Sequence, residues 1–316
     1  MIETEIIESR QIGSRLYNVL VDLFEFTVLL VRVLLEVFIT GVQHFTRKEP
    51  KDVSGEIIVI TGTGHGIGRE LALQYTDLGA TVVCVDINES GNQQTVSDCN
   101  RLQRGTAQAY TCDVSNREKV LELATKIKVQ VGPVTMLVNN AGIMPTRPLD
   151  KQTPEEIHKT FNINVLSHFW TLEAFLPHMR EQNRGHIVCI SSIAGVIGLS
   201  NLVPYCASKF AVRGLMESLQ EEIREGPHKN LIKTTTIYPY MTNTGLCKNP
   251  KVKFPKILGL LDPKQVASAI VEAQRTDVAE ATIPRGLLYL NNVCRNLPRS
   301  CAELLKDYVD SGVYSD

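Results

Sequence analysis

The stretch GEIIVITGTGHGIGRELALQYTDLGATVVCVDIN, residues 55–88, predicts one βαβ unit built around a glycine-rich loop. Ile57–Thr61 is a short apolar run of the kind that forms a parallel strand buried on both faces. We expect a helix from about Ile67 to Leu78 and a second strand over Thr81–Val85. Glycines placed between strand and helix in such a unit are typical of a dinucleotide-binding site.

Each glycine of this loop has its own predicted task. Gly62 allows a tight turn, Gly66 lets backbone N–H groups approach a pyrophosphate, and Gly68 lets the helix pack closely on the strand. The helix that begins at Ile67 points the partial positive charge of its N-terminus at the phosphates. We therefore expect all four residues to bind the cofactor.

The residue at the end of the second strand indicates which dinucleotide binds. The Asp86 carboxylate can accept hydrogen bonds from the adenosine ribose hydroxyls and would repel a 2′-phosphate, so it favours NAD(H). His65 lies in the glycine loop, where a basic group could help to hold that phosphate, but a neutral histidine does this weakly. The sequence favours NAD and keeps NADP as the alternative.

The strand–helix alternation continues over most of the chain, which predicts an α/β fold: a Rossmann-type doubly wound parallel sheet of about seven strands. The further predicted strands are Ala107–Val114, Val134–Gly142, the run GHIVCISSIAG (185–195), Ile232–Tyr240 and Glu280–Arg285. Ligands of such sheets bind beyond the carboxyl ends of the strands. We expect cofactor contacts there from Asp113 (to the adenine amino group), Val114, Asn140, Ala141, Gly142 and Pro239.

Composition narrows the function class. A formal net charge of -1 gives no basic footprint, so we expect no nucleic-acid partner. The eight cysteines form no CxxC pair, and several lie inside apolar runs, which is typical of core residues in a reducing compartment. The histidines lack metal-ligand spacing, so no metal site is expected.

Residues 17–45 are strongly apolar but carry Asp22, Glu25, Arg32 and Glu36. Helical spacing places these four charges in one narrow stripe, and the rest of the circumference is apolar. Such a helix suits a bilayer interface, or insertion with the stripe against another helix, and Arg47–Lys48 would mark the cytosolic edge. Packing on the protein's own core or on a partner subunit is the alternative.

Five motifs, in this order, resemble the short-chain dehydrogenase/reductase family. They are T-G-x-x-x-G-x-G at Thr61–Gly68, N-N-A-G at Asn139–Gly142, Asn164 in FNINVLSHF, Ser192, and Y-x-x-x-K at Tyr205–Lys209. Finer features resemble the branch of 17-beta-hydroxysteroid dehydrogenases 11 and 13 and epidermal-type retinol dehydrogenases. That branch implies an enzyme of the endoplasmic reticulum membrane or lipid droplet, with its catalytic domain facing the cytosol, acting on lipophilic alcohols.

The predicted reaction is hydride transfer between such an alcohol and its carbonyl. Tyr205 would be the general acid/base, and the Lys209 ammonium, together with the positive nicotinamide ring of NAD+, would lower its pKa. Ser192 would bind the substrate oxygen and stabilise developing charge. The resemblance further implies that Lys209 holds the nicotinamide ribose and that Asn164 supports a proton relay through water.

One departure from the family concerns the loop after the sixth strand, where Pro-Gly is usual and this chain has Pro239–Tyr240. Thr242 and Thr244 remain available to contact the cofactor. Substrate specificity is expected from the loops Met144–Leu149, Val196–Val203 and Cys247–Leu261. The apolar run LLYLNNV (287–293) is a candidate wall of the substrate mouth or a membrane contact, with a helix docked on the domain surface as the alternative.

We expect three parts in the chain: residues 1–50 as membrane-associating helix and linker, 51–290 as the NAD-binding domain, and 291–316 as a C-terminal extension. The expected partners are a lipophilic small molecule and a membrane or lipid-droplet surface. A homodimer, an NADPH-dependent carbonyl reductase and a non-catalytic scaffold at a membrane or lipid droplet stay open as alternatives.

Overall fold

The computed structural model describes residues 2–45, 48–226, 231–255 and 258–315. The chain divides into two compact units, Met1–Glu49 and Pro50–Asp316.

The first unit is formed by one helix, α1 (Ile2–Phe45). Its charged residues Asp22, Glu25, Arg32 and Glu36 are exposed. Arg47 lies outside the described residues. Over the described residues, no helix has the length and apolar content that crossing a membrane requires. Large apolar side chains are exposed as well: Tyr17, Val19, Leu20, Leu23, Phe24, Phe26, Val28, Leu29, Leu30, Val31, Val33, Leu34, Leu35, Val37, Phe38 and Ile39.

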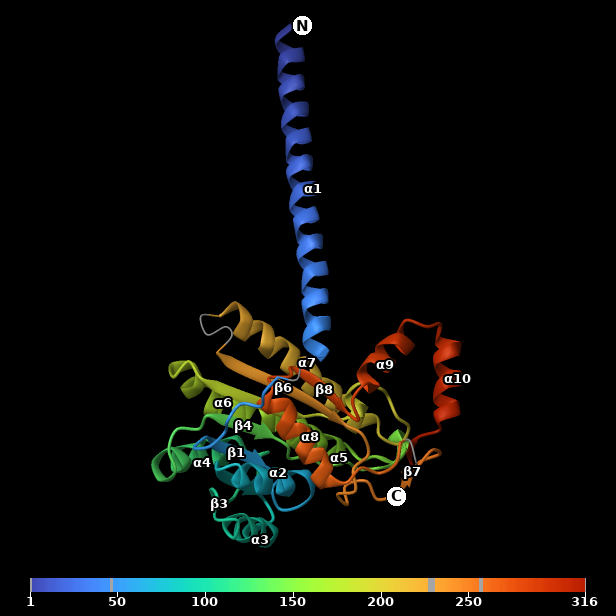
Figure 1. Ribbon diagram of the computed structural model, residues 1–316. Coiled ribbons are helices and arrows are strands. Elements are labelled where there is room, and N and C mark those ends of the chain that lie inside the picture. Colours follow the sequence, from blue (N-terminus) through green and yellow to red (C-terminus); the bar gives the residue numbers. More distant parts are fainter. Residues whose placement is uncertain (1, 46–47, 227–230, 256–257, 316) are drawn as a thin grey trace. The chain divides into compact units, whose positions relative to one another are not determined.

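The second unit is built on a seven-stranded sheet in which every neighbouring pair is parallel, with strand order β3-β2-β1-β4-β5-β6-β8. The predicted Rossmann-type fold is confirmed (Figure 1). The strands are β1 (Ile57–Thr61), β2 (Thr81–Asp86), β3 (Thr106–Thr111), β4 (Met136–Asn139), β5 (Gly185–Ile190), β6 (Ile232–Pro239) and β8 (Glu280–Ile283). The chain order reverses between β1 and β4, which is where such sheets bind ligands.

Helices cover both faces of this sheet (Figure 1). They are α2 (Gly66–Asp77), α3 (Glu89–Asn100), α4 (Arg117–Gln130), α5 (Pro154–Phe161), α6 (Ser167–Glu181), α7 (Val203–Glu225) and α8 (Pro263–Arg275). Two further helices, α9 (Leu287–Arg295) and α10 (Arg299–Val309), follow β8 along the chain and lie beside the sheet (Figure 1). Successive residues of β1 face opposite layers, because strand side chains alternate. Ile58 and Ile60 pack with α2 and α8, whereas Val59 packs with α4, α6 and α7. Each such side chain contributes roughly 1.5–3 kcal/mol on burial.

Local signals in the sequence fix several helix starts. Thr153 and Glu156 form a reciprocal capping box at the start of α5, with Pro154 in its first turn. Asn88 caps α3 by accepting a hydrogen bond from the Gly91 amide. These caps satisfy backbone donors that the first turn of a helix leaves unpaired.

Some strands are shorter than predicted. The third strand ends at Thr111 and not at Val114, because the Asp113 carboxylate accepts hydrogen bonds from the amide and hydroxyl of Ser115 and forms a turn. The fourth ends at Asn139, because the next two amides donate to Thr61 and not along the sheet. Both strands therefore end in loops at the ligand-binding edge.

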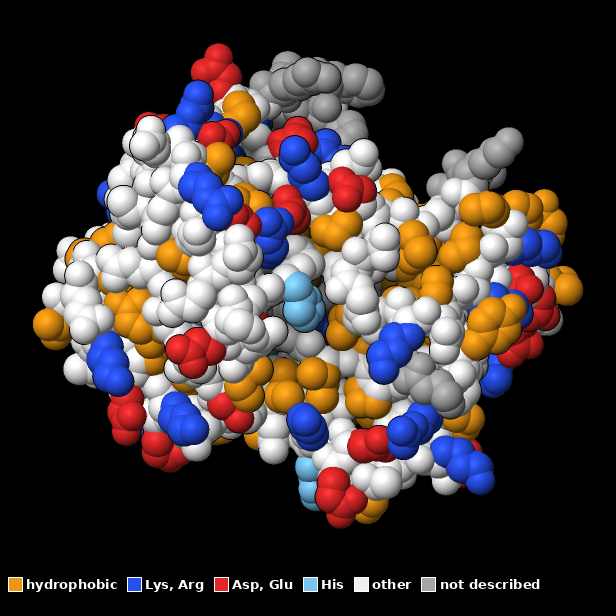
Figure 2. Space-filling view, turned by 90° about the horizontal axis from the view of Figure 1, so that it is seen from below, with side chains coloured by type: hydrophobic (Ala, Val, Ile, Leu, Met, Phe, Trp, Pro, Cys, Tyr) orange, Lys and Arg blue, Asp and Glu red, His pale blue; other side chains and the backbone are white. Residues whose placement is uncertain are grey.

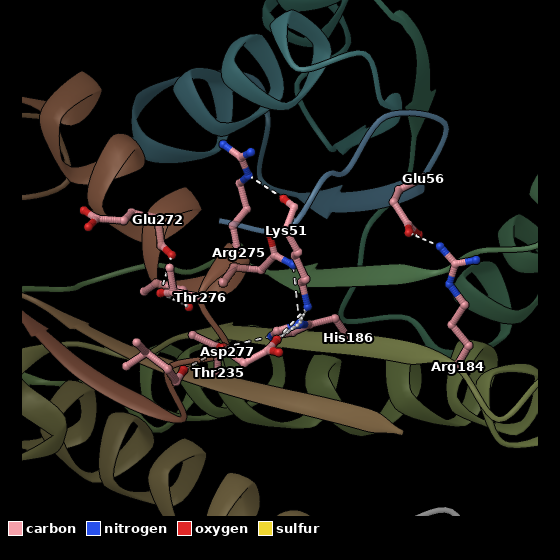
Figure 3. Close-up of polar contacts among 12 residues, drawn as sticks. Lys51, Glu56, Arg184, His186, Thr235, Glu272, Arg275, Thr276 and Asp277 are labelled. Carbon is pink, nitrogen blue, oxygen red and sulfur yellow. Dashed lines mark hydrogen bonds and ion pairs between the residues drawn. The ribbon is translucent and has the colours of Figure 1, made fainter. Parts of the chain in front are cut away.

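The start of the second unit is held by the polar cluster in Figure 3. The Lys51 amide donates to the Arg275 carbonyl (2.9 Å), and the Arg275 guanidinium donates to the Lys51 carbonyl (2.8 Å). The Lys51 ammonium lies 3.0 Å from Nδ1 of buried His186 and 2.6 Å from the Asp277 carboxylate. The segment that follows the first unit is thus attached to β5 and to the end of α8.

The C-terminal part carries an exposed apolar surface on α9 and α10. Tyr289, Leu290, Val293, Leu304 and Tyr308 are each more than half exposed. Figure 2 shows apolar side chains gathered at its right side, where Figure 1 places these two helices. The run predicted as a wall of the substrate mouth therefore turns much of its apolar surface outward.

Candidate active site

Several positions of the glycine loop accept no residue other than glycine. Gly62 and Gly66 have φ angles of 74° and 61°, which L side chains rarely adopt. A Cβ atom on Gly68 would lie 2.0 Å from the Gly62 carbonyl oxygen, so only glycine lets α2 approach β1 this closely. Helix α2 starts here without a side-chain cap, and its first amides stay available to an anion. The loop thus fits a dinucleotide pyrophosphate.

Hydrogen bonds join this loop to the one after β4. Thr61 Oγ1 accepts from the amides of Asn140 (3.0 Å) and Ala141 (3.1 Å). The Asn140 side-chain amide donates to the carbonyls of Thr61 (2.9 Å) and Gly62 (3.1 Å). The two loops on either side of the point where the strand order reverses are therefore held as one surface.

Asp86 lies against the glycine loop. Its carboxylate accepts hydrogen bonds of 2.7 Å from the amides of Gly64 and Asn88. A Cβ atom on Gly64 would lie 3.0 Å from Asp86 Oδ2, so the glycine allows this approach. The arrangement puts a fixed negative charge beside the loop that fits the pyrophosphate.

Asp113 and Val114 lie beyond the end of β3. Asp113 borders a second, separate hollow together with Ile87 and Tyr110. Val114 is buried in the hydrophobic cluster under α4. Asp113 is thus accessible at the sheet edge, whereas the Val114 side chain belongs to the core.

Ser192, Tyr205 and Lys209 line one cavity. Ser192 follows β5 by two residues, and its hydroxyl accepts a hydrogen bond from the Ala194 amide (3.1 Å). Tyr205 and Lys209 lie one turn apart near the start of α7, on the same face. Both are nearly fully buried, at 6% and 4% exposure.

The pKa of Tyr205 differs from the sequence expectation. Burial raises the pKa of Tyr205 to about 12, and a hydrogen bond with Ser192 opposes this only in part. The Lys209 ammonium donates to the Ile190 carbonyl (3.0 Å) and lies 5.8 Å from the centre of the Tyr205 ring. Burial is thus the largest influence on the phenol pKa in the protein alone, and the lowering expected from Lys209 together with NAD+ stays a prediction.

Lys209 itself is electrostatically perturbed. Burial lowers its pKa to about 8. A Cβ atom on Gly142 would lie 3.6 Å from Lys209 Nζ, so the ammonium reaches the loop after β4. The Lys209 ammonium is thus a hydrogen-bond donor in the part of the cavity between the glycine loop and Ser192.

Asn164 lies in a π-helical turn, Asn162–Leu166, between α5 and α6. Its side chain accepts from the Ile143 amide (2.9 Å) and donates to the Ile143 carbonyl (2.9 Å) and to Ser208 Oγ (3.1 Å). It is fully buried. These contacts fix the backbone after Gly142 and leave the proton-relay role as an expectation.

The loop after β6 completes the cofactor side. The side chain of Thr244 approaches the glycine loop, because a Cβ atom on Gly66 would lie 2.9 Å from that of Thr244. Thr242 donates to the Tyr240 carbonyl (2.9 Å). The Tyr240 hydroxyl is buried and has no hydrogen-bond partner among the described residues, and burial raises the pKa of Tyr240.

The cavity brings together most of the predicted residues. From that set it is lined by Gly62, Gly66, Ile67, Asn140, Ala141, Gly142, Ser192, Tyr205, Lys209, Pro239, Thr242 and Thr244. The predicted residues outside its described lining are Gly68, Asp86, Asp113, Val114 and Asn164. Among the described residues no cluster of His, Cys, Asp or Glu could hold a metal ion.

Sequence reasoning missed two groups of residues. One is apolar and lines the cavity: Met241, Leu246 and Val313. The other is a buried polar chain in which His168 Nδ1 lies 3.4 Å from Cys189 Sγ and Asn139 Oδ1 accepts from Thr171 (2.9 Å). Burial and the charge of Lys209 lower the pKa of His168 to about 3, so this histidine is neutral.

Known proteins resemble this chain over most of its length. It is 41% identical over 262 residues to short-chain dehydrogenase/reductase family 16C member 6 of Bos taurus, covering 82% of this chain and 83% of that protein. It is 39% identical to epidermal retinol dehydrogenase 2 of Mus musculus, covering 84% and 86%. It is 38% identical to estradiol 17-beta-dehydrogenase 11 of Homo sapiens, covering 91% and 93%.

Solved structures share the fold. A short-chain dehydrogenase/reductase from Burkholderia phymatum in complex with NAD has a TM-score of 0.70 at 24% identity, covering 81% of this chain and 96% of that one. A metagenomic short-chain oxidoreductase in complex with NADP has a TM-score of 0.62 at 27% identity, covering 73% and 97%. The profile of the short chain dehydrogenase family matches residues 56–252. The chain belongs to the short-chain dehydrogenase/reductase family and is an oxidoreductase.

Proposed function

We propose that this protein interconverts a lipophilic alcohol, retinol-like or steroid-like, with its carbonyl compound, using NAD(H). The observation that carries the proposal is one cavity that joins the glycine loop to Ser192, Tyr205 and Lys209. Its other walls are largely apolar, with Leu199, Leu202 and Met241 among them. Relatives at 39% and 38% identity are named for retinol and estradiol, which are lipophilic alcohols.

In the proposed reaction the bound nicotinamide accepts hydride from the alcohol carbon or returns it to the carbonyl. Ser192 orients the substrate oxygen by a hydrogen bond and stabilises charge that develops on it. Tyr205 removes or supplies the hydroxyl proton. Since burial raises the pKa of Tyr205 to about 12, the phenol is protonated at neutral pH, and positive charge beside it would favour the phenolate that alcohol oxidation needs.

Lys209 is proposed to hold the nicotinamide ribose and to stabilise negative charge on the phenol oxygen. It is buried, and one of its three N–H donors reaches Ile190. The ammonium nitrogen also lies close to Gly142 and 5.8 Å from the centre of the Tyr205 ring. Asn164 is proposed to act as a positioning residue, because its side chain holds the backbone at Ile143.

The preference for NAD is proposed from Asp86. Its carboxylate is fixed by the amides of Gly64 and Asn88, so it cannot swing away from an added phosphate without losing both hydrogen bonds. A negative charge there repels a 2′-phosphate. Solved structures of the same fold contain either NAD or NADP, so the fold leaves the choice to such residues.

We further propose that α1 associates with a membrane or lipid-droplet surface. The support is a helix with exposed Leu, Val, Phe and Ile side chains and a stripe of four charges. Flotation of the full chain and of a chain that starts at Pro50 with phosphatidylcholine vesicles separates the outcomes. Loss of flotation in the short form supports the proposal, and equal flotation contradicts it.

The decisive experiment measures turnover. Full-length protein in a membrane preparation is assayed at 340 nm with NAD+ or NADP+ and with retinol or a hydroxysteroid. We expect NADH formation that Tyr205→Phe abolishes and that Tyr289→Phe, on the exposed face of α9, leaves unchanged. No turnover with any lipid alcohol would contradict the function, and faster turnover with NADP+ would contradict the cofactor preference.

A further inference from the structure

The last described residues of the chain turn back toward the active site. Helix α10 ends at Val309, and Asp310 adopts the left-handed conformation with φ 42°. The next residues form strand β9 (Gly312–Val313), which pairs antiparallel with β7 (Pro250–Lys251). A segment about 100 residues after Tyr205 in the sequence is thereby brought to the loop that follows β6.

Several contacts hold this C-terminal segment, Asp310–Tyr314, on the loop that contains β7. The Tyr314 amide donates to the Asn249 carbonyl (2.9 Å). Lys251 forms an ion pair with Asp310 and lies 6.0 Å from the centre of the Tyr314 ring. Side-chain and backbone contacts therefore restrain the segment on both sides of the two-residue strand.

A further contact joins the C-terminal segment to the loop 196–203. The side-chain amide of Asn201 donates to the Val313 carbonyl (3.0 Å). The Asn201 carbonyl accepts from the Arg147 amide (3.0 Å). Asn201 thus ties the C-terminal segment to two of the loops from which specificity is expected, 144–149 and 196–203.

The side chain of Val313 belongs to the same buried cluster as Tyr205, the proposed acid/base. It is 6% exposed and belongs to a small hydrophobic cluster with Leu202, Tyr205 and Cys206. This cluster is separate from the two large cores on the faces of the sheet. Gly312 and Val313 both line the cavity that contains Ser192 and Tyr205. The valine therefore packs on the site and not on the structural core.

We propose that the C-terminal segment is a fourth wall of the substrate cavity and that Val313 limits the bulk of the alcohol near the reacting carbon. This proposal rests on the proposed function, because it assigns a specificity-determining residue to the same site. A β-branched side chain in this position has few rotamers, so it restricts the space without yielding. Gly312 beside it adds no side chain, which leaves the room that a substrate needs.

The test compares Val313→Ala, Val313→Phe and the unchanged full-length protein on slim and bulky alcohols with NAD+: 1-decanol, all-trans-retinol and 17β-estradiol. Removing or adding methylene-sized groups in an apolar pocket changes discrimination by about tenfold or more. We expect Val313→Ala to raise kcat/KM for estradiol relative to 1-decanol by ~10-fold, and Val313→Phe to lower it by a similar factor. Val293→Ala, on the exposed face of α9, is the matched control.

A binding arm separates this proposal from the proposed function. The fluorescence of bound NADH reports binding of estrone, retinal and decanal to each variant without any turnover. If the unchanged protein turns over no alcohol, the proposed function is contradicted. If the Val313 variants still bind the carbonyl compounds with affinities that depend on ligand size, the proposal that Val313 limits the cavity is supported. If all variants turn over the alcohols with the same ratio of kcat/KM for estradiol and 1-decanol and bind the carbonyl compounds equally, the proposed role of Val313 is overturned.

The attachment of the wall is tested with Asn201→Asp, which keeps the size of the side chain and removes the donor to Val313. NADH binding and thermal unfolding show whether each variant is folded. We expect Asn201→Asp to relax the size preference in the same direction as Val313→Ala, by a smaller factor, with KM and not kcat carrying most of the change. An unchanged preference in a folded Asn201→Asp protein would contradict the attachment.

Discussion

The Lys209 ammonium lies 5.8 Å from the centre of the Tyr205 ring and donates a 3.0 Å hydrogen bond to the Ile190 carbonyl. Burial lowers the pKa of Lys209 to about 8 and raises the pKa of Tyr205 to about 12. Burial thus disfavours the charged form of each side chain. At neutral pH only Lys209 lowers the stability of the protein, because the tyrosine is uncharged in both the folded and the unfolded chain.

Replacing Lys209 by Met is expected to stabilise the protein and to abolish turnover. In the folded protein the pKa of Lys209 is lowered from 10.5 to about 8. At pH 7 the charged ammonium is therefore less stable in the folded protein than in the unfolded chain, which lowers the free energy of unfolding. We expect the free energy of unfolding to rise by roughly 2 kcal/mol. This figure is what remains after about 1 kcal/mol is subtracted for the lost hydrogen bond. Denaturant unfolding at pH 7 measures it.

The gain should shrink as pH rises from 8 to 10.5, since the folded protein has already lost that proton while the unfolded chain still binds it. Lys126→Met, at an exposed position, is the control and should change stability by less than about 0.5 kcal/mol. A Lys209→Met protein that is less stable than the unchanged chain at pH 7 would refute this account.

The protein should lose stability as the pH falls from about 6.5 toward 3. Burial lowers the pKa of both His168 and His186 to about 3, so each stays neutral in the fold while the unfolded chain binds protons below 6.5. Their contribution is fully present above pH 6.5. Urea unfolding at pH 7.5, 6 and 5 measures the fall.

The matched variants are His186→Gln and His158→Gln, the latter at an exposed position. We expect His186→Gln to flatten the dependence on pH and to lower stability at pH 7.5, because the 2.9 Å contact of His186 Nε2 with Thr235 is disturbed. His158→Gln should leave both unchanged. Equal slopes in all three proteins would show that His186 does not titrate in this way.

Two glycines should respond oppositely to alanine. Gly68→Ala places a Cβ atom 2.0 Å from the Gly62 carbonyl oxygen, so we expect loss of dinucleotide binding or of the fold. Gly214 lies inside α7 with open space around its Cβ position, so Gly214→Ala should stabilise by up to about 1 kcal/mol. Thermal unfolding and NADH titration measure both. Retained NADH affinity in Gly68→Ala would refute the close-packing argument.

Replacing Asp86 by Asn is expected to change cofactor preference. The amide oxygen can still accept from Gly64 or Asn88, but the negative charge is lost. We expect the NADP-to-NAD affinity ratio to rise by roughly tenfold, since one unit charge near a phosphate is worth about 1–2 kcal/mol at an accessible site. Fluorescence titration with NADH and NADPH measures it. Asp98→Asn on α3 is the control, and an unchanged ratio in Asp86→Asn would rule out this role.

The sheet and the glycine loop could be predicted because local signals and long-range packing agree there. The apolar run Ile57–Thr61 is fully consistent with a strand between two helical layers. Strand ends were predicted less well, because they depend on contacts such as Asp113 with Ser115 that apolar patterning does not encode. The fold class was therefore predictable, and the lengths of its elements were only approximately so.

The site, like the fold, could be predicted from the sequence only in part. Ser192, Tyr205 and Lys209 carry recognisable types and spacing, and one cavity contains all three. Val313 has no such signal, because one valine in a short C-terminal run becomes meaningful only when β9 pairs with β7. The electrostatics also needed the structure, since the pKa of Tyr205 depends on how deeply the ring is buried.

The position of Val313 has a practical consequence for anyone who labels this protein. A fluorescent reporter or epitope tag joined to the chain close after Val313 begins within a few residues of a side chain in the cluster that contains Tyr205. Such a fusion can pull on the pairing with β7 and change which molecules are converted, while the nucleotide half of the site keeps its shape. Labels inserted at a distant surface turn would report the unaltered selectivity.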